Sequence, residues 1–192
     1  MSLQGRRLGA VLMVVTAVGF LVSGCGKSAL PSSPSPKSGV ESIRFFHHKS
    51  NVLGDGYVEK LIKAKKGGSI KLNKTYSLRI PKKALKKDTW ISMNEPWPGL
   101  MVIDLGPHGL VFRKTKKEVE LKMSYKDVDL GDVNEENLTI YYVDYDTNTW
   151  IDTNARVNTK KKEVKAEIDH FSRYALSDHM NHHISHDISH GD

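Results

Sequence analysis

Apolar and polar residues alternate in several short stretches of this chain. Every second residue from Val119 to Tyr125 is apolar, and the residues between them are charged or polar. The same period of two recurs in 76–80, 138–143 and 164–169. A strand with one face in the core and one in water has this period. The pattern therefore predicts β-strands whose inward residues include Val119, Leu121, Met123, Ile140, Val164 and Ile168.

Turn-forming residues separate these runs. They cluster at Gly67-Gly68, Pro96–Gly99, Gly106–Gly109, Asp146–Asn148 and 158–161. Short alternating strands at such spacing predict an all-β protein, an antiparallel β-sandwich.

Two segments are harder to place in this pattern. Residues 42–66 are expected to add one or two strands around a Gly54-Asp55-Gly56 turn. The only helical signal is 82–87, which follows Pro81 and predicts a single turn.

The two ends of the chain differ from this middle part. Residues 26–42 are rich in Ser, Pro and Lys, which predicts a flexible tether, and residues 177–192 are polar and histidine-rich, which predicts a disordered tail. The expected organisation is a signal segment (1–24), a lipidated cysteine with tether (25–42), the sandwich (43–176) and the tail (177–192).

The signal segment has Arg6 and Arg7 before an apolar run from 8 to 22, followed by Ser23-Gly24-Cys25. Leu-Val-Ser-Gly-Cys resembles a bacterial lipobox, which implies cleavage before Cys25 and acylation of this single cysteine. The alternative is one uncleaved membrane helix, which requires roughly 20 apolar residues. The run here is shorter and interrupted by glycine and threonine, so we expect a lipid anchor.

Net charge limits the partners. It is +7 for the whole chain and +5 without Arg6 and Arg7, which suits an anionic envelope surface. The lysines are spread along the sequence without a nucleic-acid motif, so a nucleic-acid partner is not expected. We interpret the lysine pairs as solvated turns and strand edges. The expected partners are a lipid membrane, through Cys25, and an envelope protein or anionic surface.

The segment from Gly67 onward resembles a known domain family. Its markers are Leu78-Arg79-Ile80-Pro81 with Ala84-Leu85, Gly106-Pro107-His108-Gly109-Leu110, Trp150, and His170-Phe171-Ser172 followed by Arg-Tyr-Ala. These resemble the ZU-five β-sandwich domain of ankyrins, netrin receptors and bacterial envelope proteins, over roughly residues 67–176. Lys114-Thr115 departs from the proline found there in many relatives.

In some members of that family the His-Phe-Ser triplet cleaves itself, and the resemblance implies His170, Phe171 and Ser172 as candidate catalytic residues. The residues supply a nucleophile in Ser172, a nearby base in His170 and the Phe171 carbonyl. In an uninterrupted strand, His170 and Ser172 would share the face of Ile168. An unstrained amide beside a serine is inert, however, so the alternative is that both are satisfied polar groups.

Other candidate sites are weaker. Trp97, bracketed by two prolines, is the tryptophan we expect to be exposed and to contact a partner, whereas the others are expected to pack. The tail holds five histidines that suit Zn²⁺, Ni²⁺ or Cu²⁺, namely His179, His182, His183, His186 and His190. The alternative is a polar tail that requires no cofactor. No other motif indicates an enzyme.

The sequence therefore predicts a lipid-anchored bacterial envelope protein whose sandwich binds or scaffolds a partner. Gly26, rather than aspartate, follows Cys25, which favours the outer membrane in a cell that has one. The alternatives are self-cleavage at Phe171-Ser172 and metal binding through the tail.

Overall fold

The alternating segments form strands in the structure, a computed structural model that describes residues 39–49 and 56–179. All of the described strand pairs are antiparallel, which confirms the all-β prediction. In this part of the chain the one helix is the 3₁₀ turn η1 (Glu135–Asn137), capped by the Asn134 side chain. None of the described residues forms a helix long and apolar enough to cross a membrane.

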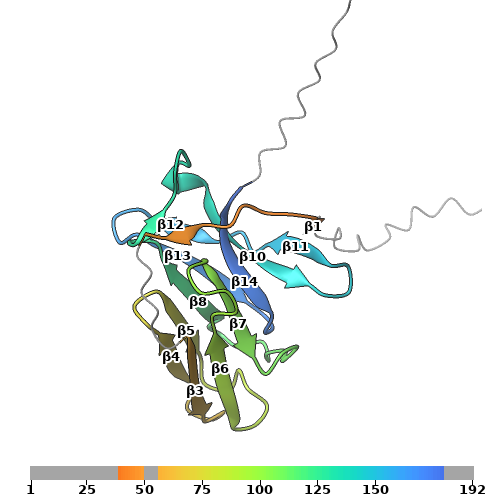
Figure 1. The fold of residues 1–192 in the computed structure, drawn as a ribbon. Helices are drawn as coiled ribbons and strands as arrows, with labels where there is room; N and C mark the ends of the chain where they lie inside the picture. The colour runs from red at the N-terminus through yellow and green to blue at the C-terminus, as the bar shows by residue number, and fades with distance from the viewer. Residues whose placement is uncertain (1–38, 50–55, 180–192) are drawn as a thin grey trace, which may run out of the picture. The chain divides into compact units, whose positions relative to one another are not determined.

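The strands form two large sheets and one small one (Figure 1). The seven-stranded sheet has the order β1 (Gly39–Val40), β11 (Thr149–Asp152), β10 (Leu138–Asp144), β14 (Arg173–Asp178), β7 (Val102–Gly106), β6 (Thr89–Asn94) and β3 (Tyr57–Ile62). The five-stranded sheet has the order β12 (Arg156–Asn158), β13 (Glu163–Ile168), β8 (Val119–Ser124), β5 (Tyr76–Ile80) and β4 (Gly68–Leu72). The short strands β2 (His47–His48) and β9 (Val128–Asp129) pair with each other.

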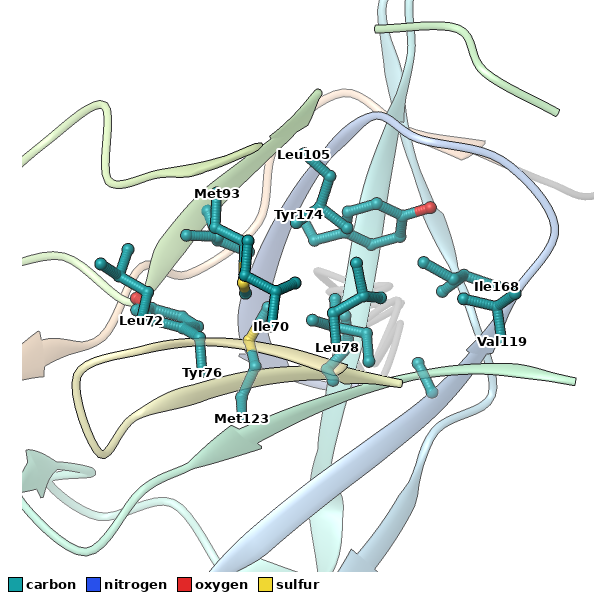
Figure 2. Close-up of a cluster of buried hydrophobic side chains, with 14 of the residues drawn as sticks. Ile70, Leu72, Tyr76, Leu78, Met93, Leu105, Val119, Met123, Ile168 and Tyr174 are labelled. Atoms are coloured by element: carbon teal, nitrogen blue, oxygen red, sulfur yellow. The ribbon is translucent and has the colours of Figure 1, made fainter. Parts of the chain in front are cut away.

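Both large sheets contribute side chains to one buried cluster (Figure 2). Leu78, Val119 and Ile168 come from the five-stranded sheet, and Met93 and Tyr174 come from the seven-stranded sheet. Burial of this apolar surface is the main stabilising contribution to the fold. The six residues that we expected to point inward all belong to the cluster.

A second, smaller cluster lies on the opposite face of the seven-stranded sheet. Val102, Tyr141 and Ala175 alternate with core residues along their strands, so their side chains point away from the main core. Ile43 and Phe45 from the N-terminal segment pack with them. This segment therefore covers part of the sheet's outer face.

The 82–87 segment is not helical, contrary to the sequence prediction. Lys83 has a φ of 68°, a left-handed conformation that ends a right-handed helix. Its N–H donates to the Ala64 carbonyl at 2.7 Å, outside the segment, while Ala84 and Leu85 are buried. Anchoring of the two apolar residues in the core therefore prevails over the N-terminal proline signal.

The β-structure also extends past the expected limits of 43 and 176. β1 lies in the predicted tether and pairs with β11, and β14 continues to Asp178. Backbone pairing adds these residues to the sheet, although three of the four are glycine or polar residues. The turn expected at Gly54-Asp55-Gly56 lies largely outside the described residues.

Trp90 does not pack in the core as expected. Its side chain is 59% exposed, more than the 41% of Trp97. Ile91 and Met93 point into the core, so the alternation along β6 places Trp90 on the outer face, opposite Leu61 of β3. Trp150 packs against the smaller cluster, and Trp97 is exposed as predicted.

Candidate functional site

The His170-Phe171-Ser172 segment connects the two large sheets. β13 ends at Ile168 in the five-stranded sheet, and β14 begins at Arg173 in the seven-stranded sheet. No uninterrupted strand therefore runs through these residues, and the condition for a shared face of His170 and Ser172 is not met. Phe171 and Ser172 are buried, whereas the His170 side chain is partly exposed at the surface.

Hydrogen bonds hold the backbone of this segment on both sides. The Phe171 N–H donates to the Leu110 carbonyl at 2.8 Å, and the Phe171 carbonyl accepts from the Gly109 N–H at 3.0 Å. The Ser172 carbonyl accepts from the Leu105 N–H at 3.1 Å. None of residues 170–172 has a positive φ. The segment is thus paired and carries no left-handed backbone strain.

The Ser172 hydroxyl donates to the Val143 carbonyl at 2.6 Å. The imidazole Nδ1 of His170 lies 2.6 Å from the Asp169 carboxylate, and its ring contacts Tyr142 edge to face at 4.8 Å between centroids. The hydrogen bonds found among the described residues include none between this imidazole and Ser172. The structure therefore brings the candidate nucleophile and base into the same segment, but each has its own partner.

A pocket of about 390 Å³ opens beside this segment. His170, Phe171 and Ser172 line one side of it. The Gly106–Leu110 loop contributes His108, and the turn after β10 contributes Tyr145. These two rings pack edge to face at 4.5 Å, and Tyr145 is 51% exposed.

Neighbouring acids and burial set the electrostatics of the pocket. Burial, and then the nearby Asp169 and Asp144, raise the pKa of the Tyr142 hydroxyl. Tyr142 therefore remains a neutral hydroxyl in the physiological range, and with His108 it gives the pocket groups that donate and accept hydrogen bonds. The lining combines aromatic surface with polar groups, as ligand pockets do.

Trp97 lies next to this segment through Arg173. The Arg173 guanidinium stacks over the Trp97 ring, 4.5 Å from its centroid, and makes two hydrogen bonds to Asp104 at 2.6 and 2.9 Å. The paired Asp104 carboxylate raises the pKa of Arg173. Phe45 contacts the same indole edge to face at 6.1 Å. Two sites predicted separately are thus connected by one residue.

Sequence reasoning did not identify His108, Gly109 and Tyr145 as site residues. His108 and Gly109 were recognised only as part of a turn, and Tyr145 belongs to a turn with an ordinary composition. The position of His108 between Pro107 and Gly109 was the available signal. These residues are neighbours because the Gly106–Leu110 loop, the turn after β10 and residues 170–172 line the same pocket.

The tail is described only as far as His179. Its Nδ1 lies 2.9 Å from an Asp152 carboxylate oxygen. Within residues 39–49 and 56–179, no group of three or more His, Cys, Asp or Glu side chains is arranged to hold a metal ion. Cys25 and the histidines 182, 183, 186 and 190 lie outside the described residues.

Comparison with known proteins gives no assignment: no family model matches the chain, and no curated protein matches it.

Proposed function

We propose that this chain is a bacterial envelope protein, anchored by lipid at Cys25, that presents a ZU-five-like β-sandwich as a binding or scaffolding module. The sandwich is supported by the single buried cluster to which both large sheets contribute. The anchor is supported by the order of charged, apolar and small residues before Cys25. Gly26 favours the outer membrane in a cell that has one.

The observation that carries the binding role is the environment of Phe171 and Ser172. Both residues are buried, neither has a positive φ, and the Ser172 hydroxyl donates to the Val143 carbonyl. A peptide bond held in this way is not poised to break. The adjoining pocket presents exposed aromatic and polar groups, which suits recognition of a partner.

The anchor is tested by substituting Cys25 with alanine in the producing bacterium. We expect an unprocessed precursor that still carries residues 1–24, because the thiol that accepts the lipid is absent. The matched control is Ser33→Ala in the tether, which leaves the lipobox intact. Normal processing and membrane retention of Cys25→Ala would show that the lipobox interpretation is wrong.

A second candidate, self-cleavage at Phe171-Ser172, is favoured by one contact. The Gly109 N–H donates to the Phe171 carbonyl oxygen, where negative charge would develop during attack. Ser172 Oγ would bond to the Phe171 carbonyl carbon, the C–N bond would break, and the hydroxyl proton would go to the released amine. Water would then hydrolyse the ester to a Phe171 carboxylate and restore the hydroxyl.

Intact mass separates the two candidates. Every described strand and both buried clusters lie within residues 39–179, and all belong to one compact unit, so a protein comprising residues 36–192 retains the fold. We expect a single mass after prolonged incubation. Two fragments whose masses sum to the parent mass plus one water, one ending at Phe171 and the other beginning at Ser172, would favour self-cleavage instead.

A further inference from the structure

Three connections meet at one end of the domain. The strands β3, β5 and β7 end there, and β4, β6 and β8 begin there. The Lys83 N–H donates to the Ala64 carbonyl at 2.7 Å, which joins the β5–β6 loop to the β3–β4 turn. The Arg113 N–H donates to the Ala84 carbonyl at 2.8 Å, which joins the β7–β8 segment to the same loop. In Figure 1, this is the end at which β3 terminates and β6 starts.

Each of the three connections is basic. The β3–β4 turn carries Lys63, Lys65 and Lys66. The β5–β6 loop carries Lys82, Lys83, Lys86 and Lys87. The β7–β8 segment carries Arg113, Lys114, Lys116 and Lys117. All eleven side chains are exposed, and the acidic residues within these three connections are Asp88 and Glu118. We call this surface the basic end.

Few acidic side chains neutralise the basic end. Among its described residues the ion pair present is Lys63–Asp88, at 3.1 Å. The Ala64 N–H, Lys63 and Lys65 together lower the pKa of Asp88, as expected for a carboxylate among cations. At the opposite end, by contrast, Lys162 pairs with Glu135. Tertiary structure thus concentrates positive charge that the sequence distributes over 55 positions.

An exposed tryptophan adjoins this charge. Trp90 is the second residue of β6 after the β5–β6 loop and faces Leu61 across the β3–β6 ladder, and Leu61 lies two residues before Lys63. Its 59% exposure leaves an amphipathic ring beside a lysine cluster. Tryptophan is enriched at the level of lipid headgroups, where one part of the ring is apolar and the other is hydrated.

We propose that the basic end binds an anionic phospholipid surface, with its lysines at the headgroups and Trp90 at the interface. Ten of the eleven cations are lysines, which act as point charges towards a diffuse anionic surface, whereas base recognition favours arginine. The two pockets described by the structure are lined by none of these cations, so an extended surface suits the basic end better than a small enclosed phosphate. The inference rests on the proposed function in one respect: the lipid anchor at Cys25 would bring the domain close to a membrane.

Binding is measured by co-sedimentation of residues 36–192 with vesicles. One set contains phosphatidylglycerol in phosphatidylcholine, and the other contains phosphatidylcholine alone. We expect binding only to the anionic set, weakening as salt is raised. Each basic residue near an anionic leaflet contributes roughly fivefold, so reversing Lys65, Lys86 and Lys116 to glutamate is expected to lower the affinity on the order of a hundredfold.

The matched control reverses Lys126, Lys160 and Lys161, which are exposed in turns at the opposite end. Both variants change the net charge equally. At physiological salt the Debye length is about 8 Å, so charges at one end of the domain are screened from a membrane bound at the other end. We expect the control to keep the parent affinity. Trp90→Phe is expected to remove the vesicle-induced shift in tryptophan emission, and thermal unfolding confirms that each variant is folded.

If the two triple variants lost vesicle affinity equally, the proposal would be overturned, because net charge alone would then explain the binding. Binding to a DNA duplex but not to anionic vesicles would also overturn it. The test omits Cys25, so a failed lipid anchor would leave its result unchanged. Conversely, loss of vesicle binding would not alter processing at Cys25.

Discussion

The Arg173 guanidinium lies 4.5 Å from the centroid of the Trp97 ring and is held there by two hydrogen bonds to Asp104. The contact joins the β6–β7 loop to the start of β14. Because Arg173 directly follows Ser172, the contact places the exposed Trp97 ring beside the end of the His-Phe-Ser segment. Arg173 thereby connects Trp97 to the His170-Phe171-Ser172 segment.

We predict that Arg173→Lys destabilises the fold by about 1 kcal/mol, because an ammonium cannot make the two-pronged contact with Asp104 and stacks less well on the indole. Urea unfolding measures this difference. Arg156→Lys is the control, since its pair with Glu167 is largely exposed and is expected to contribute less than about 0.5 kcal/mol. Equal effects in the two variants would contradict the role assigned to the stack.

Ser172→Ala is expected to cost about 1 kcal/mol, because the Val143 carbonyl loses its hydroxyl donor. Ser69→Ala, at an exposed position in β4, is the control and should unfold like the parent chain. Denaturing electrophoresis of the same samples tests cleavage. Two fragments in the parent chain and one band in Ser172→Ala would reverse our ranking, and His170→Ala would then slow the reaction as a missing base.

His48 makes the fold sensitive to mild acid. Burial lowers its pKa below 6.5, although Asp127 acts in the opposite direction. The unfolded chain therefore binds a proton first, so this contribution to stability is present above pH 6.5 and is lost as pH falls through the lower folded-state pKa.

We expect His48→Gln to reduce the loss of stability on acidification through this window, measured by urea unfolding across the pH range. The neighbouring His47 is exposed, so His47→Gln is the control. A pH dependence that is the same in His48→Gln as in the parent chain would rule out His48 as the titrating group.

Leu121→Ala is expected to cost about 2–5 kcal/mol, because Leu121 is fully buried in β8, between its partners β5 and β13. Calorimetric unfolding measures the loss. Val111→Ala removes apolar atoms from a side chain that is 62% exposed and should change stability by less than about 0.5 kcal/mol.

The histidine tail is expected to bind Zn²⁺ or Ni²⁺ modestly, because ordering a chain around a metal costs entropy that a preformed site would avoid. Titration calorimetry compares residues 36–192 with residues 36–179. The shorter protein ends after β14 and retains His179, so the comparison tests the tail histidines beyond it. Identical heats for both proteins would show that these histidines do not bind the metal.

Local patterns were sufficient for the strands with regular alternation. Alternation around Leu121, Ile140 and Val164 predicts both the strand and the buried face, because side chains of a strand point to opposite sides in turn. The exposure of Trp97 was also predictable, from its flanking prolines. The exposure of Trp90 was also predictable, because Ile91 and Met93 are apolar at alternate positions and therefore mark the inward face of β6, which excludes Trp90.

Long-range packing decided the rest. The break between Ile168 and Arg173 reflects a change of sheet, and the periodicity does not reveal it because Tyr174 and Leu176 keep the alternation set by Ile168. Likewise, the backbone partners of Phe171 and Ser172 come from residues 29 to 67 positions earlier in the chain. Their environment therefore depends on the assembled sheets.

The sequence by itself determined the period of the strands, the turns between them and the lipobox-like motif at Cys25, since each depends on residues within a few positions. Only the tertiary structure decided that Trp97 adjoins Ser172 through Arg173, and that three lysine-rich connections form one basic end. Antiparallel pairing brings alternate connections to the same end of a sheet, whatever their separation in the chain. Charges that are dispersed in sequence thereby become a single surface.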